Sequence, residues 1–162
     1  MKAWLVPVVL VGAAAACTSE PRAVTDLRAA GHDLFFGRAG CAACHRVGDE
    51  GTRIVGPNLG RGDGIDAPVA ARRRTHLPPI EYVVESIVEP DAFVVPGYAR
   101  GVMPRQEEPP VALTDDEIVA LAVFLSRGGP AVDEAAIAAA RARIAAVRTA
   151  RSARASAAPP RS

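Results

Sequence analysis

Apolar residues recur at helical spacing in three separate segments of the chain, over residues 27–35, 80–88 and 118–125. Apolar positions three and four residues apart share one face of a helix, whereas a half-buried strand alternates apolar with polar residues. No long alternating stretch lies between these segments, where the chain is instead rich in glycine and proline. The pattern therefore predicts an all-α domain.

Capping and helix-breaking residues mark where the predicted helices begin and end. Thr25 or Asp26 is placed to cap the first helix, and Thr114 with Glu117 matches a capping box at the start of the third. Proline and glycine set the other limits: Pro78-Pro79 opens the second helix, Pro90 stops it, and Gly128-Gly129-Pro130 stops the third. The predicted helices are therefore short and joined by turns.

The N-terminal residues have the composition of a targeting segment. Lys2 precedes an apolar run over residues 3–16, which ends at Cys17. A positive charge, a short apolar stretch and small residues at its end are typical of a secretory signal peptide. The run is too short to span a bilayer, which takes ~20 apolar residues.

The end of this segment, Ala14-Ala15-Ala16-Cys17, resembles a bacterial lipobox, in which the cysteine is lipidated. Two of the three cysteines form a pair elsewhere in the chain, and acylation gives a use to the thiol left over. The alternative is ordinary cleavage just before Cys17, which would leave a protein without a lipid anchor.

Charge is divided unequally along the remaining chain. Residues 18–130 contain 12 arginines and 16 acidic residues, a net charge of −4, whereas residues 131–162 contain six arginines and two acidic residues, a net charge of +4. An acidic core without a basic, aromatic-rich face excludes nucleic-acid binding by that core. We expect a signal peptide over 1–17, a tether over 18–25, one domain over 26–130, and a basic tail over 131–162.

The basic tail combines a sparse apolar stripe with arginine. Ile137, Ile144 and Val147 lie at helical spacing in a sequence of mostly alanine and arginine, which predicts a helix, and the chain from Ser152 onward is predicted to be disordered. Its charge fits an anionic membrane surface, an acidic partner protein, or the acidic core of the same chain. The sequence leaves these three alternatives open.

One motif, Cys41-Ala42-Ala43-Cys44-His45, carries the candidate chemistry. This spacing is typical of a c-type haem attachment site. Two residues between the cysteines set the thiols at the right distance to add across the two vinyl groups of a porphyrin, and the next residue then directs its imidazole at the iron. His45 is therefore predicted to be an axial ligand through one ring nitrogen, while the other nitrogen donates to a nearby acceptor.

Three alternative roles for the cysteine pair have weaker support in the sequence. A thioredoxin-like redox pair follows a strand, but residues 34–37 end a helical pattern. A zinc site needs further ligands, yet the chain has no second cysteine pair, and His32 and His76 lack ligand spacing. A structural disulfide would leave the adjacent histidine unexplained.

Three further segments match a known family: Gly56-Pro57-Asn58-Leu59, Pro96-Gly97-Tyr98 followed by Gly101-Val102-Met103-Pro104, and residues 113–118. Through these segments and the cysteine motif, the chain resembles the class I cytochromes c, especially the bacterial monohaem kind, over about residues 27–127. The resemblance implies three to five helices wrapped around one covalently bound haem c with its iron, here with an extra C-terminal helix or tail. The family's first and last helices cross closely, at positions that correspond to Gly31 and Phe124.

The resemblance also implies roles for individual residues. The Pro57 carbonyl accepts a hydrogen bond from His45, Leu59 packs on the porphyrin, and Met103 is the second axial ligand. Together with the two cysteines, these residues form the predicted haem-binding set, with His45 and Met103 on the metal.

Met103 has further features of a ligand, although a methionine is more often a core residue. It is the only methionine after the predicted signal peptide, it precedes Pro104 in a glycine-rich stretch, and it lies 58 residues after His45. The chain is then long enough to pass over the other face of a haem. His76 is the alternative ligand, but the run Arg72-Arg73-Arg74 just before it is typical of an exposed loop. These arginines would either neutralise haem propionates or a partner's carboxylates, or be solvated.

These features predict electron transfer and not catalysis, because His45 and Met103 would fill both axial positions of the iron. We expect a periplasmic one-electron carrier, anchored through a lipid on Cys17, or soluble in the periplasm if that cysteine is not acylated. Its redox partners would be a respiratory complex, an oxidase or a dehydrogenase. The alternative is a permanent cytochrome subunit of a larger membrane-bound respiratory oxidoreductase. If Met103 left the iron, the open position would allow a peroxidase or a gas sensor.

Overall fold

Helices dominate the described part of the chain, which comprises residues 22–52, 55–60, 76–126 and 131–157 of the computed structural model. In chain order the elements are α1 (Arg22–Phe36), the short 3-10 helix η1 (Cys41–Ala43), β1 (Arg46–Val47), β2 (Glu50–Gly51), α3 (Pro79–Val88), α4 (Asp115–Leu125) and α5 (Glu134–Ala157). The two strands are two residues each and pair antiparallel. The prediction of an all-α domain is confirmed. Of the helices in these ranges, none is both long and apolar enough to cross a membrane.

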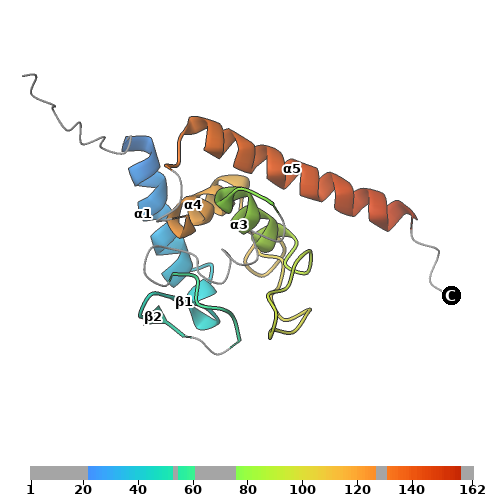
Figure 1. Ribbon diagram of the computed structural model, residues 1–162, viewed down its shortest axis with the longest axis horizontal. Helices are drawn as coiled ribbons and strands as arrows, with labels where there is room; N and C mark the ends of the chain where they lie inside the picture. Colours follow the sequence, from blue (N-terminus) through green and yellow to red (C-terminus); the bar gives the residue numbers. More distant parts are fainter. Residues whose placement is uncertain (1–21, 53–54, 61–75, 127–130, 158–162) are drawn as a thin grey trace, which may run out of the picture.

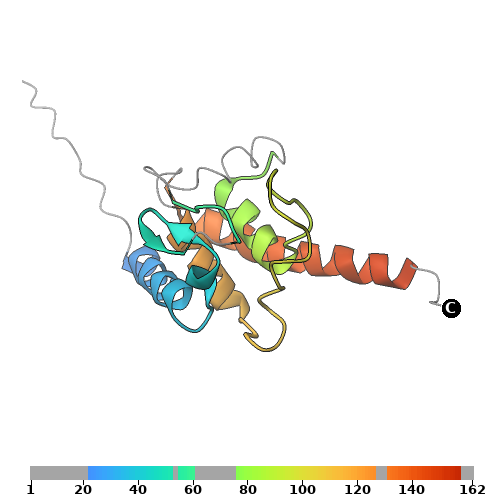
Figure 2. The same cartoon turned by 90° about the horizontal axis from the view of Figure 1, so that it is seen from below.

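Helix α4 contacts each of the other three helices (Figure 1). Helices α1 and α3 each pack against α4, and α5 lies against both α3 and α4. The β1–β2 hairpin follows η1, close to the C-terminal end of α1. In Figure 1 and in the perpendicular view of Figure 2, the C-terminal turns of α5 extend beyond the other labelled elements.

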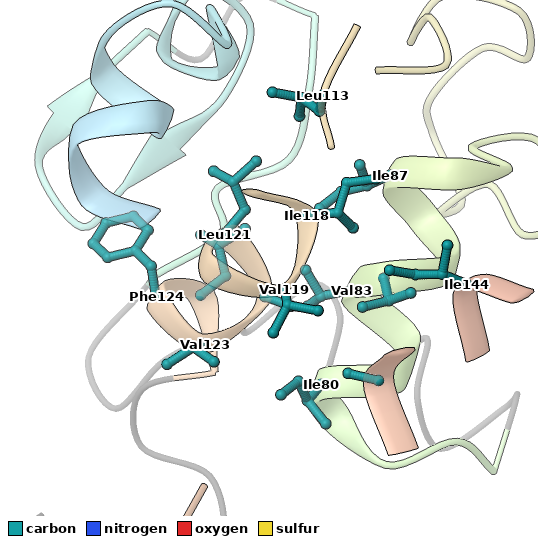
Figure 3. Close-up of a cluster of buried hydrophobic side chains, with 14 of the residues drawn as sticks. Ile80, Val83, Ile87, Leu113, Ile118, Val119, Leu121, Val123, Phe124 and Ile144 are labelled. Carbon is teal, nitrogen blue, oxygen red and sulfur yellow. The ribbon is translucent and has the colours of Figure 1, made fainter. Parts of the chain in front are cut away.

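The apolar faces of the four helices meet in one core (Figure 3). Every residue of α4 from Ile118 to Leu125 is buried, so this helix offers apolar side chains to all its neighbours. The other helices contribute Val24 and Phe35 from α1, Val84 and Val88 from α3, and Ala140, Ile144 and Val147 from α5. Burying one large apolar side chain stabilises a fold by ~1.5–3 kcal/mol. Helix α5 is therefore part of the core.

Helices α1 and α4 cross at Gly31. A Cβ atom added to Gly31 would lie 2.5 Å from the carbonyl carbon of Ala120 and 2.7 Å from Cβ of Phe124, closer than real Cβ contacts come. The absence of a side chain is therefore what permits this approach. Near the crossing, the Arg28 guanidinium donates a hydrogen bond of 2.8 Å to the carbonyl oxygen of Val123. The predicted close crossing at Gly31 and Phe124 is confirmed.

Helix α1 begins earlier than predicted. It starts at Arg22, so the end of the predicted tether is helical, and neither Thr25 nor Asp26 caps the helix. The physical reason is Val24, which is 2% exposed and extends the apolar face of the helix by one turn into the core. The predicted signal peptide and Cys17 lie outside the described residues.

The limits predicted for the second helix agree with α3. Pro78 immediately precedes the helix, Pro79 is its first residue, and the helix ends at Val88, before Pro90. Proline fits the first turn of a helix because the first N–H groups have no partner within it. The stop predicted at residues 128–130 lies outside the described part of the chain.

The predicted capping box at the start of α4 is confirmed. The N–H of Thr114 donates to Oε2 of Glu117 at 2.9 Å, and the N–H of Glu117 donates to Oγ1 of Thr114 at 3.4 Å. The Arg38 guanidinium, beyond the end of α1, pairs with the same carboxylate. Arg38 first, and then Thr114, lowers the pKa of Glu117 from 4.5 to about 2.

We expect Glu117→Gln to lower the stability of the domain by up to ~1 kcal/mol at neutral pH, because glutamine can still cap the helix but cannot pair with Arg38. A carboxyl group with a lowered pKa stabilises the fold above its unfolded pKa of 4.5 and loses this contribution as the pH falls toward 2. The difference in thermal midpoint between variant and wild type should therefore shrink from pH 7 to pH 2. An equal difference at both pH values would mean that the carboxylate charge is not its source.

Five arginines join α5 to the rest of the chain. Each lies within ion-pair distance of a carboxylate: Arg141 pairs with Asp116, Arg143 with Glu85, Arg148 with Glu107 and Asp115, Arg151 with Glu107 and Glu89, and Arg154 with Glu89. Of the three alternatives for the basic tail, the structure therefore supports pairing with the acidic core of the same chain. The prediction of disorder from Ser152 onward is wrong as far as Ala157, because the last turns of α5 are helical and extend through Arg154, which pairs with Glu89.

Candidate functional site

A largely apolar cavity lies between η1, the segment 55–59, α3 and the loop that joins α3 to α4. All of the predicted haem-binding residues line it: Cys41, Cys44, His45, Pro57, Leu59 and Met103. Its walls include aromatic and aliphatic side chains from three helices, among them Phe35, Tyr82, Val83, Ile87, Leu121 and Leu125. His76 is exposed and is not among the lining residues, whereas Arg72–Arg74 lie outside the described residues.

The first wall of the cavity is the single helical turn η1. Gly40 precedes this turn in the left-handed conformation, at a φ of 68°, which glycine adopts without strain. Within the turn, the N–H groups of Cys44 and His45 both donate to the carbonyl oxygen of Cys41, at 3.1 and 2.9 Å. One compact turn thus carries both thiols and the imidazole to the same cavity.

The two thiols in this turn are free and half-buried. Burial raises the pKa of Cys41 from 9.0 to about 11, which keeps its thiol protonated at neutral pH. A thioredoxin-like cysteine is activated by the opposite shift, toward the thiolate. The motif also follows a helix and not a strand. Both observations argue against the redox-pair alternative.

The zinc alternative also lacks support in the described part of the chain. Within it, no three or more histidine, cysteine and carboxylate side chains are grouped closely enough to hold a metal ion. A structural zinc site takes four such ligands. His32 instead packs against the rings of Phe36 and Phe124, with ring centroids 4.9 and 5.4 Å away, in a tilted and an edge-to-face arrangement.

The His45 ring has a defined orientation and a defined tautomer. Its Nδ1 lies 3.0 Å from the carbonyl oxygen of Pro57. A carbonyl oxygen only accepts hydrogen bonds, so Nδ1 carries the proton and the lone pair is on Nε2. Burial lowers the pKa of His45, against a smaller opposite effect of this hydrogen bond, so the ring is neutral at neutral pH. A neutral imidazole with a free Nε2 is the form that binds a metal.

Gly56 is a site residue whose role sequence reasoning missed. A Cβ atom added there would lie 2.5 Å from Nδ1 and 2.8 Å from Nε2 of His45, so the backbone of Gly56 packs directly against the ring. The N–H of Gly56 donates to the carbonyl oxygen of Cys44 at 3.0 Å, which fixes the segment to the cysteine turn. The signal in the sequence was a glycine directly before the proline whose carbonyl holds the histidine.

Asn58 holds the same segment from its other end. Its side-chain amide donates to the carbonyl oxygen of Gly48 at 3.1 Å, and its Oδ1 accepts from the N–H of Gly60 at 3.0 Å. The N–H of Leu59 donates to the carbonyl oxygen of Arg46 at 2.6 Å. These bonds tie the segment to the β1–β2 hairpin, with Leu59 lining the cavity.

Met103 reaches the cavity from an irregular loop between α3 and α4. The side chain is half-buried and lies among the lining residues. On one side the loop is closed by Asp91, whose Oδ1 accepts from the N–H of Gly101 at 2.9 Å. On the other side, the backbone of Gln106 makes two hydrogen bonds. Its N–H donates to the carbonyl oxygen of Ile87 at 3.4 Å, and its carbonyl oxygen accepts from the N–H of Leu113 at 2.8 Å. The thioether is therefore presented by a segment that is tied at both ends.

Gln106 is a second lining residue that sequence reasoning missed. It is 8% exposed, and its Oε1 is buried without a hydrogen-bond partner. A buried polar atom that lacks a partner costs free energy. No motif in the sequence singles out this residue, because its burial depends on the packing of the loop against α3.

The exposed large apolar residues of the described chain both belong to this cavity. Val55 is 44% exposed and Val102 is 48% exposed, and each lines it. These two residues are far apart in the sequence: Val55 directly precedes Gly56, and Val102 directly precedes Met103. Apolar side chains left in water at the mouth of a cavity are typical of a contact surface.

The donor set fits a covalently attached haem. Two neighbouring thiols can form thioether bonds, a neutral imidazole with its lone pair on Nε2 can bind iron, and a thioether lies in the same cavity. Apolar walls suit the porphyrin, which would fill space that no side chain of the described chain fills.

Comparison with known protein families identifies the family of the chain. The family described as Cytochrome c matches residues 29–128, which is well over half of the chain. No curated protein matches the sequence. The matched residues include the cysteine motif, His45, the 56–59 segment and Met103, and they end before α5.

Proposed function

Because the chain belongs to the cytochrome c family, which binds a covalent haem c with iron, we propose that it is a periplasmic one-electron carrier with His45 and Met103 as axial ligands. Family membership itself indicates haem-based electron transfer by a protein that is generally not an enzyme. The observation that supports this ligand pair best is the hydrogen bond from His45 to Pro57, which leaves Nε2 free in the cavity that Met103 also lines.

The residues of the chain account for the chemistry required of a carrier. A bound haem c supplies a one-electron couple between ferric and ferrous iron. His45, held by Pro57 and Gly56, offers a neutral nitrogen in a fixed direction. Met103 offers a neutral thioether, which favours the ferrous state and raises the reduction potential. If His45 and Met103 both bind the iron, no coordination position on it would remain for a substrate.

Met103→Leu tests this proposal, because leucine keeps the apolar volume but removes the sulfur. We expect the reduced wild-type protein to resist carbon monoxide at neutral pH and the variant to bind it rapidly. The reduction potential should fall by on the order of 100 mV, a fraction of the ~0.8 V over which axial ligands tune haems. His76→Ala is the matched control and should change neither property. Carbon monoxide binding by the control and not by Met103→Leu would make His76 the ligand.

The mouth of the cavity is the proposed docking surface for a redox partner. Val55 and Val102 supply an exposed apolar contact there. A small, partly apolar surface suits a transient redox complex, which typically buries less than ~1,200 Å². We propose that the partner is a respiratory complex, an oxidase or a dehydrogenase.

A free carrier is favoured over a permanent subunit by the state of α5. Its five arginines are paired with carboxylates of the same chain, so they are engaged inside the molecule. Purification from native membranes in mild detergent separates the two functions. A free carrier migrates alone, whereas a permanent subunit migrates with its complex.

The proposed location rests on the N-terminal sequence. A signal peptide that ends in Ala14-Ala15-Ala16-Cys17 supports export and acylation of Cys17. The mass of the mature protein tests this: acylation predicts an N-terminal cysteine carrying lipid, and Cys17→Ser should release the protein from membranes. A mature wild-type protein that is soluble and carries no lipid would overturn the anchor but not the export.

A further inference from the structure

The loop that carries Met103 is held from outside by α5. Glu107, four residues beyond Met103, has a side chain that is only 7% exposed. Its Oε2 lies 2.6 Å from Nε of Arg148, and its other oxygen pairs with Arg151. The loop thus places a buried carboxylate between two arginines of a single helix.

A second link joins the same parts of the molecule. Glu89, at the end of α3, accepts a hydrogen bond of 2.8 Å from Arg105, which follows Met103 by two residues. The other oxygen of Glu89 lies 3.7 Å from Arg151. Arg151 also donates to the carbonyl oxygen of Val88 at 3.2 Å. One arginine of α5 therefore contacts the end of α3 and, through Glu107, the Met103 loop.

The position of α5 itself does not depend on these links. Ala140, Ile144 and Val147 bury the helix against the core, and Arg143 pairs with Glu85 of α3, away from the loop. α5 also lies beyond residues 29–128, the part that matches the family. Helix α5 is therefore an additional element whose own contacts with the core and with α3 fix its position, so it can restrain the Met103 loop.

We infer that α5 acts as a clamp on the Met103 loop, with Glu107, Arg148 and Arg151 as positioning residues that keep the thioether directed into the cavity. This inference rests on the proposed ligation by His45 and Met103. An outward movement of the loop that withdraws Met103 and carries Glu107 with it separates Glu107 from Arg148 and Arg151. An unpaired charge would then be left partly buried, which is strongly unfavourable. The clamp therefore opposes the opening of the distal side of the haem.

A competing ligand measures how often the loop opens. Imidazole added to the oxidised holoprotein binds only when Met103 has left, so its apparent affinity is proportional to the open fraction. Binding is followed by the loss of the methionine-to-iron charge-transfer absorption. We expect Glu107→Gln to raise the apparent affinity for imidazole by about tenfold or more. Arg151→Gln should raise it in the same direction, and the double variant should add little to the larger single effect.

Arg143→Gln is the matched control, because it removes an ion pair between α5 and α3 that does not reach the loop. It should change the imidazole affinity by less than about twofold. An equal rise for Arg143→Gln and Glu107→Gln would overturn the clamp, since both changes would then act through general loosening. Unchanged affinity in Glu107→Gln would overturn it as well. If that variant yields no holoprotein, the half-exposed Arg151→Gln decides in the same way.

The same measurement distinguishes failure of the clamp from failure of the ligand assignment. Wild-type protein that lacks the methionine-to-iron absorption would overturn ligation by Met103, and the clamp with it. Wild-type protein that shows this absorption, together with variants that resist imidazole equally, would overturn the clamp alone.

Discussion

Gly31→Val is expected to destabilise the domain by ~3 kcal/mol or more and to deplete the folded protein. Even the first carbon of the new side chain would lie 2.5 Å from the Ala120 carbonyl carbon and 2.7 Å from Cβ of Phe124. The closest obstacle is backbone in the buried part of α4, which cannot move aside as a side chain can. α1 and α4 must therefore separate, and overpacking of this kind costs ~1–3 kcal/mol even where the surroundings can relax. Denaturant unfolding of the holoprotein measures the loss.

Ala30→Val is the control for this variant. It introduces the same side chain one residue earlier, on the exposed face of α1. Only helix propensity should change, at a cost of ~0.5 kcal/mol. Equal unfolding midpoints for the two variants would show that the crossing tolerates a side chain and would contradict the packing argument.

Gly56→Val is expected to have the largest effect on the site itself. A Cβ atom there would lie 2.5 Å from Nδ1 and 2.8 Å from Nε2 of His45, so the imidazole cannot keep its position. Its displacement breaks the hydrogen bond to Pro57 that fixes the tautomer and the direction of Nε2. Loss of such a supporting contact typically lowers metal affinity or activity by ~10–100-fold. We expect the yield of haem-loaded protein to fall by at least about tenfold.

The ratio of haem absorbance to protein measures this yield in cells that also express the haem-attachment machinery. Val55→Ala, at the exposed neighbouring residue, should keep the wild-type ratio. A Gly56→Val protein with a wild-type ratio and unchanged axial spectra would mean that the His45 ring can move without loss of iron binding.

Local signals in the sequence were enough to predict two of the helices. The limits of α3 follow from prolines at both ends, and the start of α4 follows from a capping box whose two partners are three residues apart. The cysteine motif likewise acts within one turn, so its contribution to the site could be read from spacing. In each case the physics involves neighbours along the chain.

The features that could not be predicted depend on distant residues. α1 extends back to Arg22, where Val24 is buried in the core, and this burial depends on residues of the other helices. The order of α5 near and beyond Ser152 involves ion pairs with carboxylates far away in the sequence, such as Glu107 with Arg151. The role of Gly56 became visible only when the structure placed it under the imidazole. Ligation by Met103 and acylation of Cys17 remain predictions.

The crossing of α1 and α4 has a consequence for the order of events during biosynthesis. The contact between Arg28 and Val123 joins residues 95 positions apart, so the fold cannot close until nearly the whole domain has emerged. If the chain is exported from its N-terminus, as proposed above, Cys41 and Cys44 reach the far side of the membrane well before α4 does. At that stage no burial yet raises the pKa of Cys41, and both thiols are open to the attachment machinery. Late closure thus leaves an interval in which the porphyrin can be joined before the fold encloses it.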